Sequence, residues 1–199
     1  MKFAFVSGNP ALDLVGTVES RRDKSVDLLM TAADLEDWIS ECDELPAQVT
    51  VDAAAFTAVL ELREAIYQLA LDRMHSRRFT QAALDTVNEA AAGQVPTVEL
   101  SDDGLHLSGD LRAAQAHVAR SGIAVLADLH ACLKECGRAA CTRLYLDRSR
   151  GARRTWCGME SCGNRVKASA YRARRQAGQA AAQGLDPKKG RVPTPRGRP

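Results

Sequence analysis

Two pairs of cysteines in the last third of the chain offer a defined chemistry. Cys136 and Cys141 form the first pair, Cys157 and Cys162 form the second, and four residues separate the members of each pair. If the two pairs come together, they provide four thiolates, the closed tetrahedral shell that structural zinc prefers. Four soft sulfur ligands favour zinc over hard cations and leave no open position for a substrate water. The spacing predicts a structural zinc site; a redox or disulfide pair and buried free thiols are the alternatives.

The other candidate ligands are interpreted as structural residues. Cys42 and Cys132 are expected to be small core residues, although Cys132 lies four positions before Cys136 on a predicted helix and could replace a ligand. None of the four histidines is near the cysteine pairs in sequence. In a reducing cytosol, six cysteines are more naturally metal ligands or buried thiols than disulfides.

Charge is distributed unevenly along the chain. Residues 134–199 hold 17 lysines and arginines against four acidic residues, whereas residues 1–133 hold 10 basic and 21 acidic residues. This asymmetry predicts two modules with different partners, the second of which is suited to a polyanion.

The segment that follows Cys162 has the pattern of a basic helix. Val166, Ala170, Ala173 and Ala177 fall within one arc of about 60°, which we expect to pack against the zinc core. Positive charge on the remaining surface suits phosphate contacts. Base-stacking aromatic residues are scarce here, which favours DNA over single-stranded RNA. The alternatives are a solvated charged surface, contact with an acidic protein, or contact with the acidic half of the chain itself.

Capping residues and apolar periodicity predict four helices that precede the cysteines. They are expected over residues 31–42 with Thr31 as the cap, 51–74 with Asp52 as the cap, 79–93 with Thr80 as the cap, and 111–135 with a weak point at Gly122.

Strands are expected in three places. Residues 3–20 are interpreted as one or two short strands interrupted by an Asn9-Pro10 turn, and an Asp103-Gly104 turn predicts a hairpin. Residues 144–146 and 155–156 are expected to form a hairpin around the loop 147–154. The fold class is therefore mainly α with short β elements (α+β): a helical N-terminal domain over residues 1–133, a small treble-clef-like zinc module over 134–178, and a disordered basic tail over 179–199.

The sequence resembles a known family at two places. Cys162-Gly163-Asn164-Arg165 and the residues around them resemble the CGNR zinc finger, and "ALDLVGTV", "LREAIYQLA" and "LDTVNEAAA" look like the ABATE domain that accompanies this finger. The resemblance implies a bacterial transcription regulator, in some members stress-induced, whose C-terminal finger binds zinc and DNA. It also implies that Cys136, Cys141, Cys157 and Cys162 are the zinc ligands. The chain departs from the family pattern at Gly16, where asparagine is expected before Thr17.

The resulting hypothesis is a zinc-dependent, DNA-binding transcription regulator in the cytoplasm, with no membrane partner and no enzymatic activity. The N-terminal domain is expected to sense a small-molecule ligand or to form a homodimer. A zinc-stabilised module that binds an acidic protein is the alternative. Asp147 could hold Arg148 in a local ion pair instead of leaving it to phosphate. The candidate nucleic-acid contacts are Arg148, Arg150, Arg153, Arg154, Asn164, Arg165, Lys167, Arg172, Arg174 and Arg175.

Overall fold

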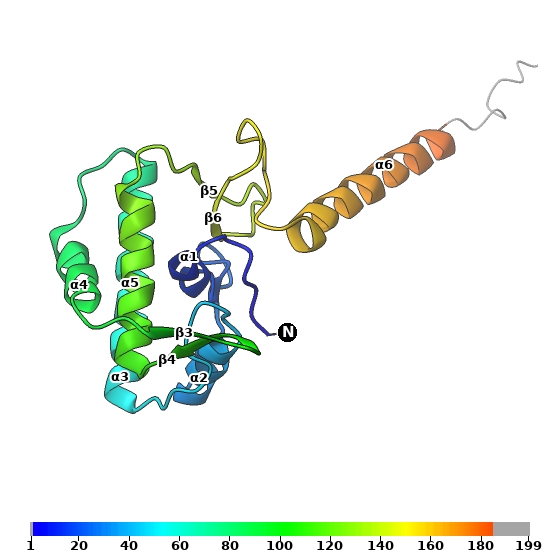
Figure 1. Cartoon of the computed structure of the whole chain (residues 1–199). Coiled ribbons are helices and arrows are strands. Elements are labelled where there is room, and N and C mark those ends of the chain that lie inside the picture. The colour runs from blue at the N-terminus through cyan, green and yellow to red at the C-terminus, as the bar shows by residue number, and fades with distance from the viewer. Residues whose placement is uncertain (1, 185–199) are drawn as a thin grey trace, which may run out of the picture. The chain divides into compact units, whose positions relative to one another are not determined.

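The computed structural model describes residues 2–184 (Figure 1). The chain divides into two compact units, Met1–Gly158 and Met159–Pro199, and each is described by itself. The part of the predicted basic tail after residue 184 lies outside the described residues. No helix within the described range is long and apolar enough to cross a membrane.

Four helices that pack on one another form the centre of the first unit. They are α1 (Pro10–Val15), α3 (Ala53–Met74), α4 (Gln81–Ala91) and α5 (Leu111–Ala127), and α2 (Ala32–Ser40) packs against α3 (Figure 1). Leu12, Leu62 and Ile66 are almost completely buried among them. With its short antiparallel strand pairs, the molecule confirms the predicted α+β class.

Helix α1 lies where strands were predicted on both sides of an Asn9-Pro10 turn, and of the strands predicted over residues 3–20 only Val18–Glu19 forms. The side chain of Asn9 accepts hydrogen bonds from the backbone nitrogens of Ala11 (3.0 Å) and Leu12 (3.3 Å), and Pro10 occupies the first helical turn. An asparagine cap followed by proline is a helix start as well as a turn signal, because the missing proline N–H costs nothing in the first turn.

The caps of the longer helices follow the prediction, with one difference. Thr31 forms a capping box with Asp34, and Asp52 accepts from the backbone nitrogen of Ala55 at 2.8 Å. Thr80 stands at the N-cap position of α4, but its hydroxyl donates to Asp72 instead of capping the helix (2.9 Å). These residues begin helices because they satisfy backbone N–H groups or fix the entering chain.

Helix α5 is continuous through Gly122 and ends earlier than predicted. A Cβ at Gly122 would lie 3.2 Å from the Cβ of Ala11, so the glycine allows close approach of α1 instead of breaking the helix. Asp128 takes an extended conformation after the last turn, and Leu129 is 84% exposed. Residues predicted to continue this helix form strand β5 (Leu133–Glu135).

Strand β5 pairs antiparallel with β6 (Leu144–Leu146). The predicted partner of β6, residues 155–156, is not a strand. Leu144 and Leu146 belong to the same hydrophobic core as the helices. The hairpin beside the cysteines is thus part of the first compact unit, which continues to Gly158.

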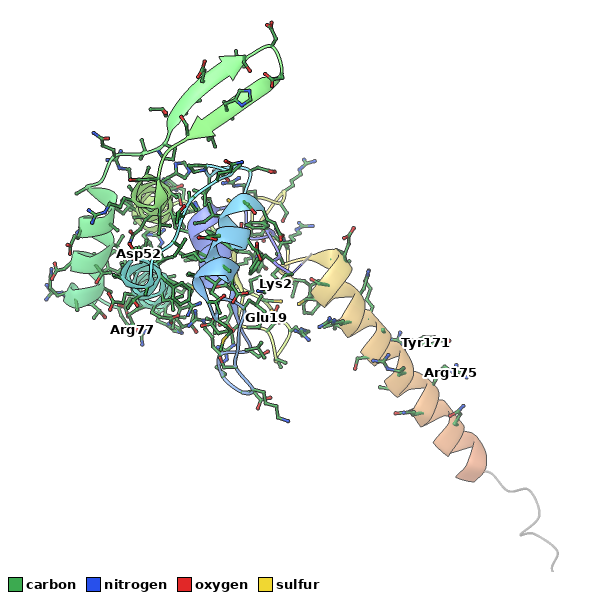
Figure 2. All side chains as sticks on the ribbon, turned by 90° about the horizontal axis from the view of Figure 1, so that it is seen from below. Lys2, Glu19, Asp52, Arg77, Tyr171 and Arg175 are labelled. Carbon is green, nitrogen blue, oxygen red and sulfur yellow. The ribbon has the colours of Figure 1, made fainter. Side chains whose placement is uncertain are left out.

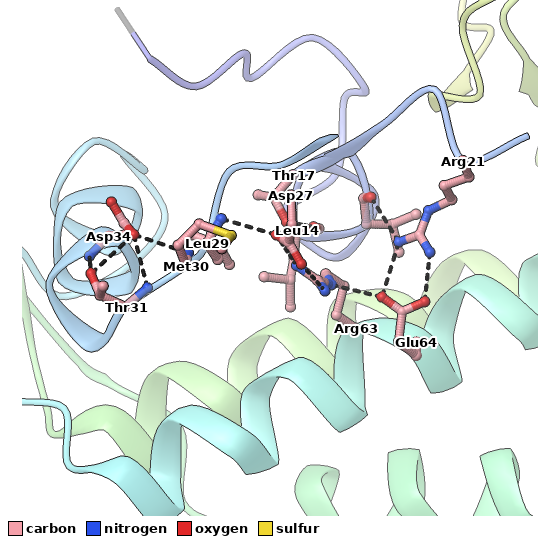
Figure 3. Close-up of polar contacts among 11 residues, drawn as sticks. Leu14, Thr17, Arg21, Asp27, Leu29, Met30, Thr31, Asp34, Arg63 and Glu64 are labelled. Carbon is pink, nitrogen blue, oxygen red and sulfur yellow. Dashed lines mark hydrogen bonds and ion pairs between the residues drawn. The ribbon is translucent and has the colours of Figure 1, made fainter. Parts of the chain in front are cut away.

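Strands β1 (Val18–Glu19) and β2 (Val26–Asp27) pair antiparallel next to a buried arginine. The guanidinium of Arg63 donates to both carboxylate oxygens of Asp27, at 2.8 and 2.7 Å, and to Glu64 at 2.8 Å (Figure 3). Arg21 reaches Glu64 from the other side and stacks over Tyr67 at 4.1 Å. This network fixes the strand pair to α3.

The third strand pair is a hairpin, β3 (Thr97–Ser101) and β4 (Gly104–Ser108), which projects from the helical body (Figure 2). Ser101 pairs with Gly104, so the turn is Asp102-Asp103, one residue earlier than predicted.

The second unit begins with a π-helical turn (Met159–Gly163) and continues as α6 (Asn164–Gly184). This helix extends six residues past position 178, where the zinc module was predicted to end.

Candidate metal centre and basic helix

The four cysteines of the two pairs form one cluster. Their sulfur atoms all lie within 4.8 Å of one another, and Cys136, Cys141, Cys157 and Cys162 are all buried. Zinc–sulfur bonds of about 2.3 Å in a tetrahedron place the sulfurs about 3.8 Å apart, and the Cys141 and Cys157 Sγ atoms are 3.9 Å apart. A disulfide would require about 2.05 Å, and no disulfide joins any of the six cysteines. The donor set and its geometry fit structural zinc.

Strands β5 and β6 position the first cysteine pair. Cys136 follows β5 directly, and its backbone nitrogen donates to the carbonyl oxygen of Arg143 at 3.0 Å. Cys141 closes the knuckle by donating to the carbonyl oxygen of Arg138 at 2.7 Å. Gly137 lies against Thr155, where a Cβ would come within 2.8 Å of the threonine methyl group. Only glycine allows the two knuckles to approach so closely.

The second pair reaches the cluster through the loop 147–158. The backbone N–H of Cys157 points at the sulfur of Cys136 at 3.5 Å, a geometry that stabilises a thiolate. Burial raises the pKa of the Cys136 thiol, and the neighbouring Cys141 raises it further. A bound cation reverses this preference, so zinc binding releases protons. When bound, zinc supplies a cross-link between the two knuckles, with no open position for substrate.

Arg154 connects this loop to the N-terminal segment and to β6. Its guanidinium lies 4.6 Å from the ring centroid of Tyr145 and donates to the carbonyl oxygens of Trp156 (2.8 Å), Val6 (3.0 Å) and Cys157. The hydroxyl of Tyr145 donates to the carbonyl of Arg154 at 2.7 Å. Arg154 therefore acts in the structure as the positioning residue of the second knuckle, although the sequence suggested a phosphate contact.

Asp147 organises the opposite end of the loop. It accepts from Lys134 at 2.7 Å and from the backbone nitrogens of Ser149 and Arg154, both at 2.9 Å. Burial alone would raise the pKa of Asp147, but these partners outweigh it and lower the pKa. Asp147 thus forms its ion pair with Lys134 and not with Arg148, which was the alternative to a phosphate contact of Arg148.

The remaining candidate nucleic-acid contacts are at the surface. The exposed residues of this set are Arg148, Arg150, Arg153, Asn164, Arg165, Lys167, Arg172, Arg174 and Arg175. Tyr171 and Arg175 mark the helix α6 in Figure 2. Within residues 2–184, no hydrogen bond or ion pair engages the basic side chains of α6. Because these residues are exposed, they are available to a partner.

The predicted packed face of α6 differs from the expectation. Val166 is half-buried, but Ala170, Ala173 and Ala177 are exposed. Small alanine side chains offer little apolar area to bury, so their alignment on one face was weak evidence for packing.

Sequence reasoning missed the polar contacts that join the cysteine knuckles to the N-terminal segment. The hydroxyl of Ser20 donates to the carbonyl of Ala140 at 2.8 Å, and the backbone N–H of Arg21 donates to the Thr142 hydroxyl at 3.1 Å. The guanidinium of Arg143 reaches Glu19 at 3.1 Å. More than a hundred residues separate these partners, and no local sequence signal could have identified them.

Cys42 and Cys132 lie outside the cluster. Cys42 is buried in the hydrophobic core, as predicted, and Cys132 is half-buried in the segment before β5. Within residues 2–184, no histidine joins a group of potential metal ligands.

A four-cysteine zinc site attached to a helical domain defines the molecule as a zinc-finger protein. Residues 133–175 match the CGNR zinc finger. Residues 8–129 match the ABATE family, which is described as "Putative stress-induced transcription regulator". This match covers more than half of the chain, and the chain belongs to the ABATE family. A comparison with curated proteins finds no match.

Proposed function

We propose that the protein is a transcription regulator that binds DNA through its zinc-stabilised C-terminal region. The observation that carries this proposal is the exposed basic surface of α6, which begins two residues after the last cysteine. Arg165, Lys167, Arg172, Arg174 and Arg175 are exposed on this helix. Side chains of this type, presented on several sides of a helix, suit contacts with phosphates on both edges of a groove.

The zinc site supports this proposal by fixing the start of the helix. Cys162 is a ligand of the cluster, and α6 starts at Asn164. Without the metal, the first turn of the helix would lose the zinc–thiolate bond of Cys162 that fixes its position. DNA binding should therefore depend on zinc.

The proposed role is regulatory and not enzymatic, and it requires a location in the bacterial cytoplasm, where the chromosome is accessible. The acidic N-terminal domain supplies the input, as a sensor of a small molecule or as a dimerisation module. Support for this division of roles comes from the family description and from the opposite charges of the two halves of the chain.

Selection from a random duplex library tests the proposal. Zinc-loaded full-length protein is incubated with the library at physiological salt, with Cys157→Ser as the unfolded-knuckle control and Cys132→Ser as the matched control outside the cluster. An enriched motif that is lost in Cys157→Ser and kept in Cys132→Ser is the expected result. Equal retention of all duplexes would reduce the function to non-specific polyanion binding. No retention would favour the acidic-protein partner instead.

A further inference from the structure

The loop that follows β6 presents three arginines at the surface of the first unit. Arg148, Arg150 and Arg153 are exposed. Within residues 2–184, no hydrogen bond or ion pair engages their guanidinium groups, whereas the neighbouring Arg154 stacks on a tyrosine and donates to backbone carbonyl oxygens. The loop therefore carries positive charge that the described part of the chain does not use.

The carboxylate of Asp147 does not neutralise these arginines, because its charge is used inside the loop. The Asp147 side chain has no exposed surface. One oxygen accepts from the backbone nitrogen (2.9 Å) and the hydroxyl (2.6 Å) of Ser149, and the other accepts from the ammonium group of Lys134 (2.7 Å) and the backbone nitrogen of Arg154 (2.9 Å). Asp147 is the only acidic residue in the segment 147–158. The outer surface of the loop thus carries no negative charge.

Ser149 fixes the turn that carries the three arginines. Its hydroxyl accepts from the backbone nitrogens of Arg153 (3.0 Å) and Arg154 (3.2 Å), and its carbonyl oxygen accepts from the backbone nitrogen of Ala152 at 2.9 Å. The turn passes through two successive left-handed residues, Gly151 at a φ of 73° and Ala152 at a φ of 49°. A residue with a side chain stays in this region only where its surroundings hold it there, and such residues cluster in ligand-binding loops. The backbone of the loop is therefore ordered before any partner binds.

We propose that Arg148, Arg150 and Arg153 form a second phosphate-binding element for duplex DNA, and that Asp147 and Ser149 are its positioning residues. The inference rests on the proposed function and adds to it a contact surface in the first unit, separate from α6. Guanidinium groups form short, charge-assisted and often bidentate hydrogen bonds with phosphate oxygens. Three such groups on one loop suit the repeated charges of a phosphate backbone. A loop that is already ordered also loses less entropy on binding than a flexible one.

The sign of one substitution separates this positioning role from simple electrostatics. Asp147→Asn removes a negative charge, and this removal by itself strengthens binding to a polyanion. In the positioning role, the amide replaces one accepting oxygen by a donor and loses the ion pair with Lys134. The loop then loses its order, and the affinity for DNA falls. The two explanations therefore predict opposite changes in affinity.

Fluorescence anisotropy of zinc-loaded, full-length protein with a labelled duplex tests the inference at several salt concentrations. Asp147→Asn and Ser149→Ala should weaken binding about 2–10-fold at physiological salt, because the arginines must be ordered on binding. In Arg150→Gln/Arg153→Gln, the slope of log affinity against log salt should fall by about 0.9 for each phosphate contact that is lost. Glu160→Gln is the control matched to Asp147→Asn in charge, because Glu160 is exposed and lies outside the loop. It should bind at least as tightly as the wild type.

Zinc content and the thermal midpoint show whether the variants are folded. Ser149 is exposed, and Ser149→Ala keeps every charge, so this variant decides the question if Asp147→Asn loses zinc. Folded loop variants that bind as tightly as the wild type, with the same salt slope, overturn this inference and leave the assignment of α6 intact. A folded Asp147→Asn that binds more tightly than the wild type also overturns the positioning role. A wild type that does not bind the duplex overturns this inference together with the proposed function.

Discussion

Arginines in the first unit and arginines on α6 have different surroundings. Arg63 is 4% exposed and Arg143 is 9% exposed, and both have carboxylate partners. Arg172 and Arg175 are exposed on α6, and no ion pair engages them within the described range. The same side chain thus acts as an internal cross-link in one region and is available to a partner in the other.

This difference shows that basic composition alone does not identify an interface. A buried guanidinium must have partners, because an unpaired buried charge is costly. An exposed one gains little from a surface ion pair. Substitutions of the buried arginines Arg63 and Arg143 should therefore reduce stability, and substitutions of the exposed arginines on α6 should reduce DNA binding.

Zinc removal should have the largest effect and should extend beyond the knuckles. Structural zinc contributes about 10–16 kcal/mol of apparent folding energy to small finger peptides. Because Leu144 and Leu146 of the adjoining hairpin belong to the core, chelation or Cys157→Ser should lower the thermal midpoint of the helical domain as well. Metal analysis measures the zinc content, and circular dichroism measures the thermal midpoint of the helical domain. Cys132→Ser should keep one zinc per chain, and an unchanged helical midpoint after zinc loss would contradict the shared core.

Arg63→Ala should have the next largest effect on stability. It leaves the carboxylate of Asp27 without its bidentate partner, and because that carboxylate is partly exposed we expect a loss of about 2–3 kcal/mol, below the range for fully buried pairs. Arg22→Ala is the control: Arg22 pairs with Glu135 but its side chain is 58% exposed, and exposed pairs contribute about 0–1 kcal/mol. Urea unfolding of both variants makes the comparison. Equal losses of unfolding free energy in the two variants would show that the buried ion pair is no more stabilising than the exposed one.

Glu64→Gln should have a smaller effect that depends on pH. Burial alone would raise the pKa of Glu64, but the ion pairs with Arg21 and Arg63 outweigh it and lower the pKa. A lowered folded-state pKa contributes stability above the unfolded value of about 4.3, and this contribution is lost as the pH falls below it. The variant should be less stable than the wild type at pH 7 and should converge with it in acid. Unfolding midpoints between neutral and acidic pH test this, and a constant difference would exclude the ionic contribution.

Arg172→Gln/Arg175→Gln should have the smallest effect on stability, within about 0.5 kcal/mol, because both positions are exposed. Its effect should appear in DNA binding: the slope of log affinity against log salt should fall by about 0.9 for each phosphate contact that is lost. Fluorescence anisotropy with a labelled duplex at several salt concentrations gives the slope. A destabilised variant with an unchanged salt slope would show that Arg172 and Arg175 stabilise the fold and do not contact DNA.

Local signals in the sequence predicted much of the helical framework. Thr31 and Asp52 form the caps that the sequence indicated, and the four cysteines cluster as their spacing required. Both kinds of signal depend on neighbours within a few residues or on the strict geometry of one metal. The prediction at Asn9-Pro10 was wrong because the same pair can begin a turn or a helix, and distant packing against α5 decides between them.

Contacts between distant segments could not be predicted. Strand β6 pairs with β5 and not with residues 155–156, a choice that depends on which strand can also bury Leu144 and Leu146 in the helical core. Arg154 could not be distinguished from its neighbour Arg153, because only the fold places Tyr145 beneath it. The Asp103-Gly104 turn signal predicted the β3–β4 hairpin but did not indicate that Val98, Leu100 and Leu105 would remain exposed.

The contacts of Val6 and Ser7 have a consequence for the time at which the protein folds. The carbonyl of Val6 accepts from Arg154, 148 residues later, and the carbonyl of Ser7 accepts from the backbone of Leu146. At about 5–20 residues per second, a ribosome needs roughly 7–30 s to synthesise the intervening chain. The helices can form during this time, but Val6 and Ser7 can reach these partners only after Leu146 and Arg154 have been synthesised. Contacts of such long range slow folding, and the four-cysteine site is complete only when Cys162 has been synthesised, after all the residues of α1 to α5.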